Sequence, residues 1–126
     1  MLRCAITALA LLLVAGCAKR EIPSSAPRPT LSGLVRVQGK SMLPTFPEHA
    51  YVQVEIGTTF DELRAGDTVI FWDYRRGDNA FAHHRLVQKQ GDAWIARGDN
   101  NSAADQSWVT RDNFYVRTTG EWWPFL

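Results

Sequence analysis

The sequence predicts a mainly β domain, a small antiparallel folded sheet or partly open barrel with few short helical turns. Short runs of β-branched and aromatic residues recur along the chain, and Gly and Asp residues separate them. No segment has the length of a good amphipathic helix. Many short strands with this punctuation favour an antiparallel sheet that folds on itself, and 126 residues suit one small domain.

The expected strands follow one another with short polar connections. The segment 51–56 alternates most clearly, because Val52, Val54 and Ile56 fall on one face of an extended chain. The other expected strands are 34–37, 68–74, 80–88, 93–96 and 114–118. The segments expected outside strands are a helical turn at 61–65, a polar turn at 75–79 and a polar loop at 98–107.

The composition excludes several classes of protein. Hydrophobic residues make up 45% of the chain and charged residues 21%, which is too apolar for an intrinsically disordered chain. No internal repeat indicates a solenoid. The net charge of +1 gives no electrostatic reason to expect a nucleic-acid partner.

Residues 1–16 are expected to form a signal peptide. Arg3 precedes an apolar run that only Thr7 interrupts, and the run is too short to span a bilayer comfortably. It ends in Val14-Ala15-Gly16-Cys17, which resembles the lipobox of bacterial lipoproteins, whose cysteine is lipidated and becomes the new N-terminus. We expect export to the cell envelope and a lipid anchor on Cys17. A simple secretory signal and an uncleaved anchor are the alternatives, and both also imply export.

Residues 17–33 are expected to be the lipidated cysteine and a Pro/Ser-rich tether, which leaves 34–126 as the folded domain. Three of the six prolines lie in this tether, whose extended reach is at most roughly 50 Å. Cys4 would leave with the signal peptide, so the domain keeps no thiol for a disulfide, a metal ligand or a nucleophile. We expect no cofactor and no metal.

One serine stands where a hydroxyl could reach solvent. Ser41 follows an expected strand, and Pro44 behind it favours a turn. Serine needs a neighbouring base, because its hydroxyl is not nucleophilic at neutral pH. His49 is expected to be solvated. His83 and His84 are adjacent on an expected strand and point to opposite faces, so only one of them can face Ser41.

A carboxylate on the polar loop could hold such an imidazole in the right tautomer. Asp99 and Asp105 both lie on this loop. Lys40, next to the serine, is expected to point away from it, and Lys89 is placed too far beyond the histidines to act as the base. Ser, His and Asp occur in almost every domain of this size, so these residue types alone carry little weight.

Four ordered segments resemble the conserved boxes of the type I signal peptidases. The resemblance covers residues 37–117, which is nearly the whole expected domain. The four segments are Gly39-Lys40-Ser41-Met42-Leu43-Pro44-Thr45, Ala65-Gly66-Asp67-Thr68-Val69, His84-Arg85-Leu86-Val87 and Gly98-Asp99-Asn100-Asn101. All four in this order are highly specific, and they imply the folded β sheet of that family.

The resemblance implies Ser41 as the nucleophile. The usual bacterial members have Lys before the Arg of the third box, whereas the endoplasmic-reticulum type has His, so His84 indicates the Ser-His(-Asp) branch. Asp105 matches the acidic residue that supports the histidine in this branch. Asp99 is expected to be a structural carboxylate that bonds loop amides, and it is the fallback partner of His84. The segment departs from the family pattern after Asp105, where Gln106 stands in place of Arg.

The resemblance also implies the reaction and its substrates. Exported proteins would be cleaved after small residues, in an Ala-x-Ala pattern, through an acyl-enzyme on Ser41. The Ser41 backbone N–H would be one oxyanion donor, and Gly39 leaves the second unassigned, because some members carry Ser there. Met42, Val37 and Val52 would help to line two shallow apolar pockets, although the valines could equally belong to the core.

Two other readings compete with a peptidase. One is a catalytically weak relative, a lipoprotein that binds peptides or assists the assembly of an envelope complex. The other is a self-cleaving repressor-like protease, which fits poorly because those enzymes pair Ser with Lys and carry a DNA-binding domain. The aromatic segment 121–126 predicts either contact with the membrane interface or closure of a small core.

Overall fold

A computed structural model describes residues 31–77 and 80–126. The expected signal peptide, Cys17 and the tether up to residue 30 therefore lie outside the described residues. Within the two described ranges, no helix is long and apolar enough to cross a membrane.

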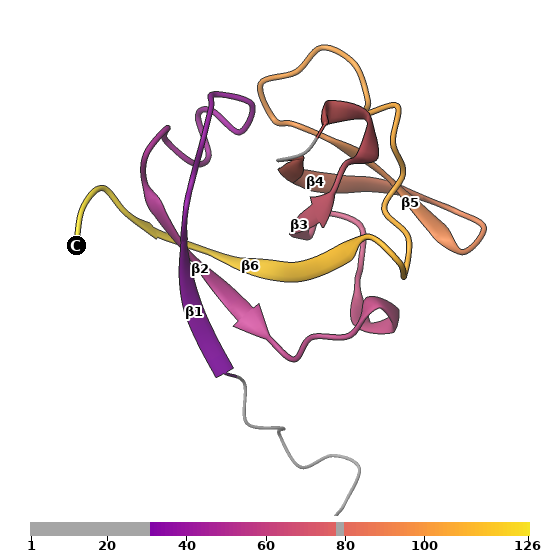
Figure 1. The fold of residues 1–126 in the computed structure, drawn as a ribbon, viewed down its shortest axis with the longest axis horizontal. Helices are drawn as coiled ribbons and strands as arrows, with labels where there is room; N and C mark the ends of the chain where they lie inside the picture. Colours follow the sequence, from indigo (N-terminus) through magenta and orange to yellow (C-terminus); the bar gives the residue numbers. More distant parts are fainter. Residues whose placement is uncertain (1–30, 78–79) are drawn as a thin grey trace, which may run out of the picture.

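The described chain forms one six-stranded antiparallel sheet in the order β1-β2-β6-β3-β4-β5, which confirms the mainly β prediction. Figure 1 shows β6 running across the middle of the molecule, with β1 and β2 on one side and the remaining strands on the other. The sheet stays open, with β1 and β5 at its edges. The strands are β1 (Leu31–Arg36), β2 (Tyr51–Ile56), β3 (Thr68–Trp72), β4 (Phe81–Gln90), β5 (Ala93–Arg97) and β6 (Phe114–Trp123).

Two short 3-10 turns connect the strands, at Phe60–Glu62 and Tyr74–Arg76. The first overlaps the helical turn expected at 61–65 but begins one residue earlier and ends at Glu62. The second begins the expected polar turn between β3 and β4, where the Asp73 carboxylate accepts a hydrogen bond from the Arg75 backbone N–H.

β1 and β6 depart most from the strands that the sequence predicts, and both are longer than expected. β1 begins at Leu31, inside the expected tether, because it pairs with β2 over the full length of that strand, from Leu31 opposite Ile56 onward. β6 continues beyond the expected end at residue 118, since its last residues pair with β2 at Trp122 and Trp123. Both corrections have one cause, which is that pairing with a distant strand extends a segment whose local pattern is weak.

Side chains alternate between the two faces of the sheet. On β4, Ala82, His84 and Leu86 are no more than 2% exposed, whereas Phe81, which points to the opposite face, is 51% exposed. The largest core lies on the face that carries His84. It contains Phe60, Leu63, Val69, Phe71, Ala82, Leu86, Trp94, Ala96 and Val109.

Two smaller clusters complete the core. One joins Val37, Met42, Phe46 and Val52, and it fixes the segment between β1 and β2. The other joins Val54, Ile70 and Val116 across the middle of the sheet.

The aromatic C-terminal segment does not close the core. Trp122 and Trp123 are 39% and 40% exposed, and Phe125 is 78% exposed. Of the two expectations for this segment, closure of the core is wrong.

Candidate active site

Ser41 lies in a tight turn between β1 and β2. The turn is anchored from inside by Met42 and Phe46, each 1% exposed, and the Phe46 backbone N–H donates to the Met42 carbonyl at 2.9 Å. Gly39 approaches the turn with φ +83°, a conformation that favours glycine. The two buried side chains of Met42 and Phe46, which follow Ser41 in the chain, fix the turn that carries the Ser41 hydroxyl.

The structure brings Ser41, His84 and Asp105 together. His84 Nε2 lies 3.1 Å from Ser41 Oγ, and His84 Nδ1 lies 2.5 Å from Asp105 Oδ2. A carboxylate only accepts hydrogen bonds, so Nδ1 carries the proton and Nε2 presents its lone pair to the serine hydroxyl. The side chains of His84 and Asp105 are 1% and 8% exposed. The arrangement can move a proton from the serine to the histidine and stabilise the resulting cation.

Asp99 lies elsewhere in the site. Its two carboxylate oxygens accept from Arg85 Nε at 2.9 Å and Arg85 Nη2 at 2.8 Å, and Oδ2 also accepts from Thr45 Oγ1 at 2.5 Å. The hydrogen bonds from Arg85 hold the pKa of Asp99 below its usual range, and burial opposes them. Asp99 is thus a structural carboxylate, but its partners are two side chains. The expectation that it bonds loop amides is wrong, because both carboxylate oxygens accept hydrogen bonds from side chains instead.

The loop that follows β5 also fixes the backbone of the serine turn. The Asn100 backbone N–H donates to the Ser41 carbonyl at 2.8 Å, and its side-chain amide donates to the Lys40 carbonyl at 3.1 Å. A Cβ at Gly98 would lie 2.7 Å from the Ser41 carbonyl oxygen. These contacts explain why Gly and Asn flank Asp99, which sequence reasoning treated only as part of a motif.

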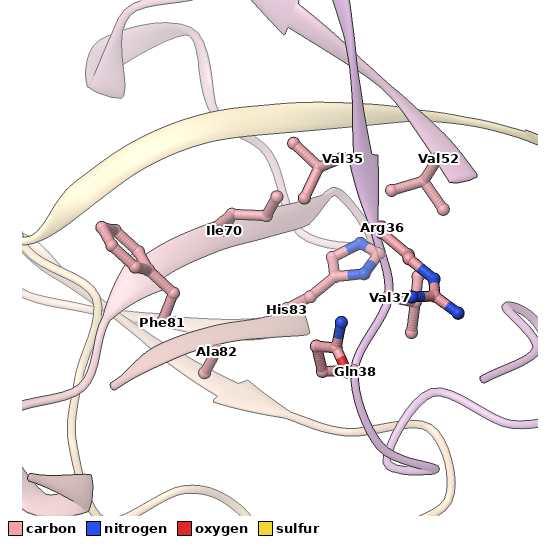
Figure 2. A pocket seen from close by; sticks show the side chains of 9 residues that line it. All are labelled: Val35, Arg36, Val37, Gln38, Val52, Ile70, Phe81, Ala82 and His83. Atoms are coloured by element: carbon pink, nitrogen blue, oxygen red, sulfur yellow. The ribbon is translucent and has the colours of Figure 1, made fainter. Parts of the chain in front are cut away.

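The segment 35–38, which leads from β1 towards Ser41, and the first residues of β4 line a cavity of about 200 Å³ (Figure 2). Val37 and Val52 line it, and both also belong to a core cluster. Met42 does not line it; its side chain is buried, and its sulfur accepts from the Asp99 backbone N–H at 3.4 Å. The expected pocket role of Met42 is therefore replaced by a role in the core. The full lining is Val35, Arg36, Val37, Gln38, Val52, Ile70, Phe81, Ala82 and His83.

His83 occupies the face of β4 opposite to His84, as alternation predicts. Figure 2 shows its ring extending from β4 into the cavity. Its Nε2 lies 3.1 Å from Thr118 Oγ1, its ring contacts Phe46, and its buried Nδ1 has no hydrogen-bond partner among the described residues. Burial lowers the pKa of His83 from 6.5 to about 4, with a further contribution from His84.

This low pKa predicts that acid weakens the fold. The unfolded chain takes up a proton at His83 below about pH 6.5, whereas the folded chain resists it down to about pH 4. Stability is fully present above pH 6.5 and falls by about 3 kcal/mol as the pH drops through this window. Urea unfolding at pH 7.5 and pH 4.5 measures the loss. His83→Gln should lose much less stability over the same interval, and an equal loss in both proteins would contradict the prediction.

The other candidate bases have surroundings of their own. His49 has a side chain that is 55% exposed and pairs with Glu48 at 3.1 Å, and Lys40 is exposed. The Lys89 ammonium lies 5.7 Å from the centre of the Trp94 ring. Among residues 31–77 and 80–126, no group of three or more His, Cys, Asp or Glu side chains could hold a metal ion.

Comparison with known proteins gives one informative match. No family model matches the chain, and no solved structure gives a significant match. The chain is 35% identical over 103 residues to Signal peptidase I W of Bacillus subtilis (strain 168), and the alignment covers 77% of this chain and 53% of that protein. The chain thus spans about half the length of this relative. The similarity supports a relationship at family level to the type I signal peptidases.

Proposed function

We propose that this protein is a membrane-anchored serine endopeptidase of the signal peptidase type, which cleaves exported proteins after small residues. The observation that carries the proposal is the continuous line from Ser41 Oγ through His84 to Asp105, with separations of 3.1 Å and 2.5 Å. The relative named Signal peptidase I W supports the same class of reaction.

The proposed mechanism is acyl transfer. Ser41 Oγ attacks the scissile carbonyl while its proton passes to His84 Nε2, and Asp105 stabilises the imidazolium. The tetrahedral intermediate collapses, the C–N bond breaks, and His84 returns the proton to the leaving amine. Water then attacks the acyl-enzyme, again with His84 as base. The Ser41 backbone N–H is the proposed oxyanion donor, and Gly39 supplies no side chain as a second one.

The proposed substrate is an extended peptide that places a small side chain in the cavity lined by Val37 and Val52. The lining is largely apolar and includes Val37 and Val52, which suits an apolar side chain; the preference for alanine-sized residues follows from the resemblance to the signal peptidases. β1 is an edge strand that leads directly into the serine turn, so a peptide could add to its free edge through backbone hydrogen bonds.

The proposed location is the extracytoplasmic face of a bacterial membrane, with the lipid on Cys17. The motif around this cysteine supports the anchor, and no nucleic-acid partner is proposed. Mass spectrometry of the membrane-extracted protein should find an acylated Cys17 at the N-terminus. An N-terminus at Met1 would refute the anchor.

Cleavage of a detergent-presented peptide bearing Ala-x-Ala tests the activity directly. The full chain should cleave it, Ser41→Ala should abolish cleavage, and the rate should rise between about pH 6 and 8, where histidines ordinarily lose their proton. Circular dichroism controls for folding of the variant. A rate that rises only above pH 9 would indicate a lysine base. Failure of the folded, unmutated chain on several such peptides would favour the peptide-binding or assembly role instead.

A further inference from the structure

Asp105 is carried by a loop, so its position depends on what holds that loop. The Asp105 backbone N–H donates to the Ala96 carbonyl at 2.8 Å. Further along, Trp94 and Val109 exchange two backbone hydrogen bonds of 2.8 Å and close the loop. Two residues between these points, Gln106 and Ser107, bind side chains of another segment.

That segment is the connection between β3 and β4. Asp73, at its start, is 5% exposed, and its Oδ1 accepts from Ser107 Oγ at 2.6 Å. The same oxygen accepts from the Arg75 backbone N–H at 3.1 Å. Arg75 Nη1 in turn donates to Gln106 Oε1 at 2.7 Å. A buried carboxylate held by several donors is a rigid acceptor, and hydrogen bonds to a charged group are among the stronger ones.

The electrostatics of Asp73 agree with this role. Burial alone would raise its pKa, but the hydrogen bonds from Ser107 and the Arg75 backbone, together with the charge and hydrogen bond of Arg76, outweigh burial and lower the pKa of Asp73 below its usual value. Asp73 therefore stays ionised at neutral pH. The reaction proposed above does not use this buried charge, although it lies next to the loop that carries Asp105.

We propose that the Asp73–Ser107 hydrogen bond, supported by the Arg75–Gln106 hydrogen bond, is a latch that positions the Asp105 carboxylate against His84. Its effect on rate rests on the proposed peptidase function. Ser107 is two residues from Asp105, so a fixed Ser107 side chain limits how far the intervening backbone can carry the carboxylate. Asp73 and Ser107 act through Asp105 and are positioning residues.

Kinetics of the full chain test the latch. Ser107→Ala removes the hydroxyl and should lower kcat by about 10- to 100-fold with little change in KM, since a displacement of about 1 Å can cost 100-fold. Asp73→Asn should act in the same direction, and Ser107→Thr, which keeps a hydroxyl, should recover most of the rate. Arg76→Ala is the matched control. Arg76 Nε lies 3.1 Å from the other oxygen of Asp73, so this substitution keeps both hydrogen bonds of the latch.

A second readout is independent of turnover. The proton between His84 Nδ1 and Asp105 should give a far-downfield ¹H resonance in the chain labelled with ¹⁵N-histidine. Ser107→Ala and Asp73→Asn should shift or broaden it, and Arg76→Ala should leave it in place. If the unmutated chain is inactive but the resonance still changes in Ser107→Ala and Asp73→Asn, the peptidase function is refuted and the latch is supported. A lowered melting temperature with the resonance and kcat unchanged would overturn the latch.

Discussion

Asp105→Asn should lower kcat by about 1,000- to 10,000-fold and leave the domain folded. The carboxylate accepts from His84 Nδ1 at 2.5 Å, which keeps the lone pair of Nε2 directed at Ser41. An amide in its place can donate to Nδ1, and the imidazole then carries its proton on Nε2. In that tautomer it cannot accept the proton of the serine hydroxyl. Single-turnover cleavage of a peptide bearing Ala-x-Ala measures the loss.

Asp99→Asn is the matched control for this experiment. Asp99 lies on the same loop, but its partners are Arg85 and Thr45, so this change should act mainly on stability. Weakening the hydrogen bonds to the charged Arg85 should cost about 1 to 3 kcal/mol in urea unfolding, with at most about a 10-fold fall in kcat. If Asp99→Asn in a folded protein lowered kcat as far as Asp105→Asn, Asp99 would be the partner of the histidine and the assignment to Asp105 would fail.

The parts of this fold that the sequence predicts well are those encoded locally. The strand Tyr51–Ile56 has the expected bounds, because alternation and a following glycine define it within a few residues. The ends of β1 and β6 depend on pairing with β2, which no local pattern encodes. For the same reason, the sequence did not predict that Trp122 and Trp123 extend the sheet by pairing with β2.

In the candidate site, too, local patterns were predictable and long-range contacts were not. Alternation predicts that His83 and His84 face opposite sides, but only the family resemblance indicated which of them meets Ser41. The partners of Asp99 and Asp73 could not be predicted, since each is a long-range side-chain contact between loops. Met42 was misassigned for a related reason, because an apolar residue beside a nucleophile suits a pocket and a core equally well in sequence.

Gly98→Ala should remove most of the activity, because two loops meet too closely at this glycine to admit a side chain. A Cβ there would lie 2.7 Å from the Ser41 carbonyl oxygen and 2.6 Å from Asn101 Nδ2. The Asn101 amide can rotate away, but the Ser41 carbonyl belongs to the backbone of the serine turn. That carbonyl also accepts from the Asn100 backbone N–H at 2.8 Å, so relief of the clash must stretch this bond or shift the turn.

Either response moves Ser41 Oγ relative to His84. Overpacking of this kind costs about 1 to 3 kcal/mol of stability, and a displacement of about 1 Å at the nucleophile lowers the rate about 100-fold. Gly33→Ala is the matched control: Gly33 also lacks a positive φ, and its Cβ would meet Val54 and Ile56 at ordinary distances of 3.4 Å and 3.5 Å. Urea unfolding and single-turnover cleavage of both variants give the comparison. If Gly98→Ala retained full activity, the close approach of the two loops would not be what fixes the serine, and its position would have to come from the buried anchors Met42 and Phe46 alone.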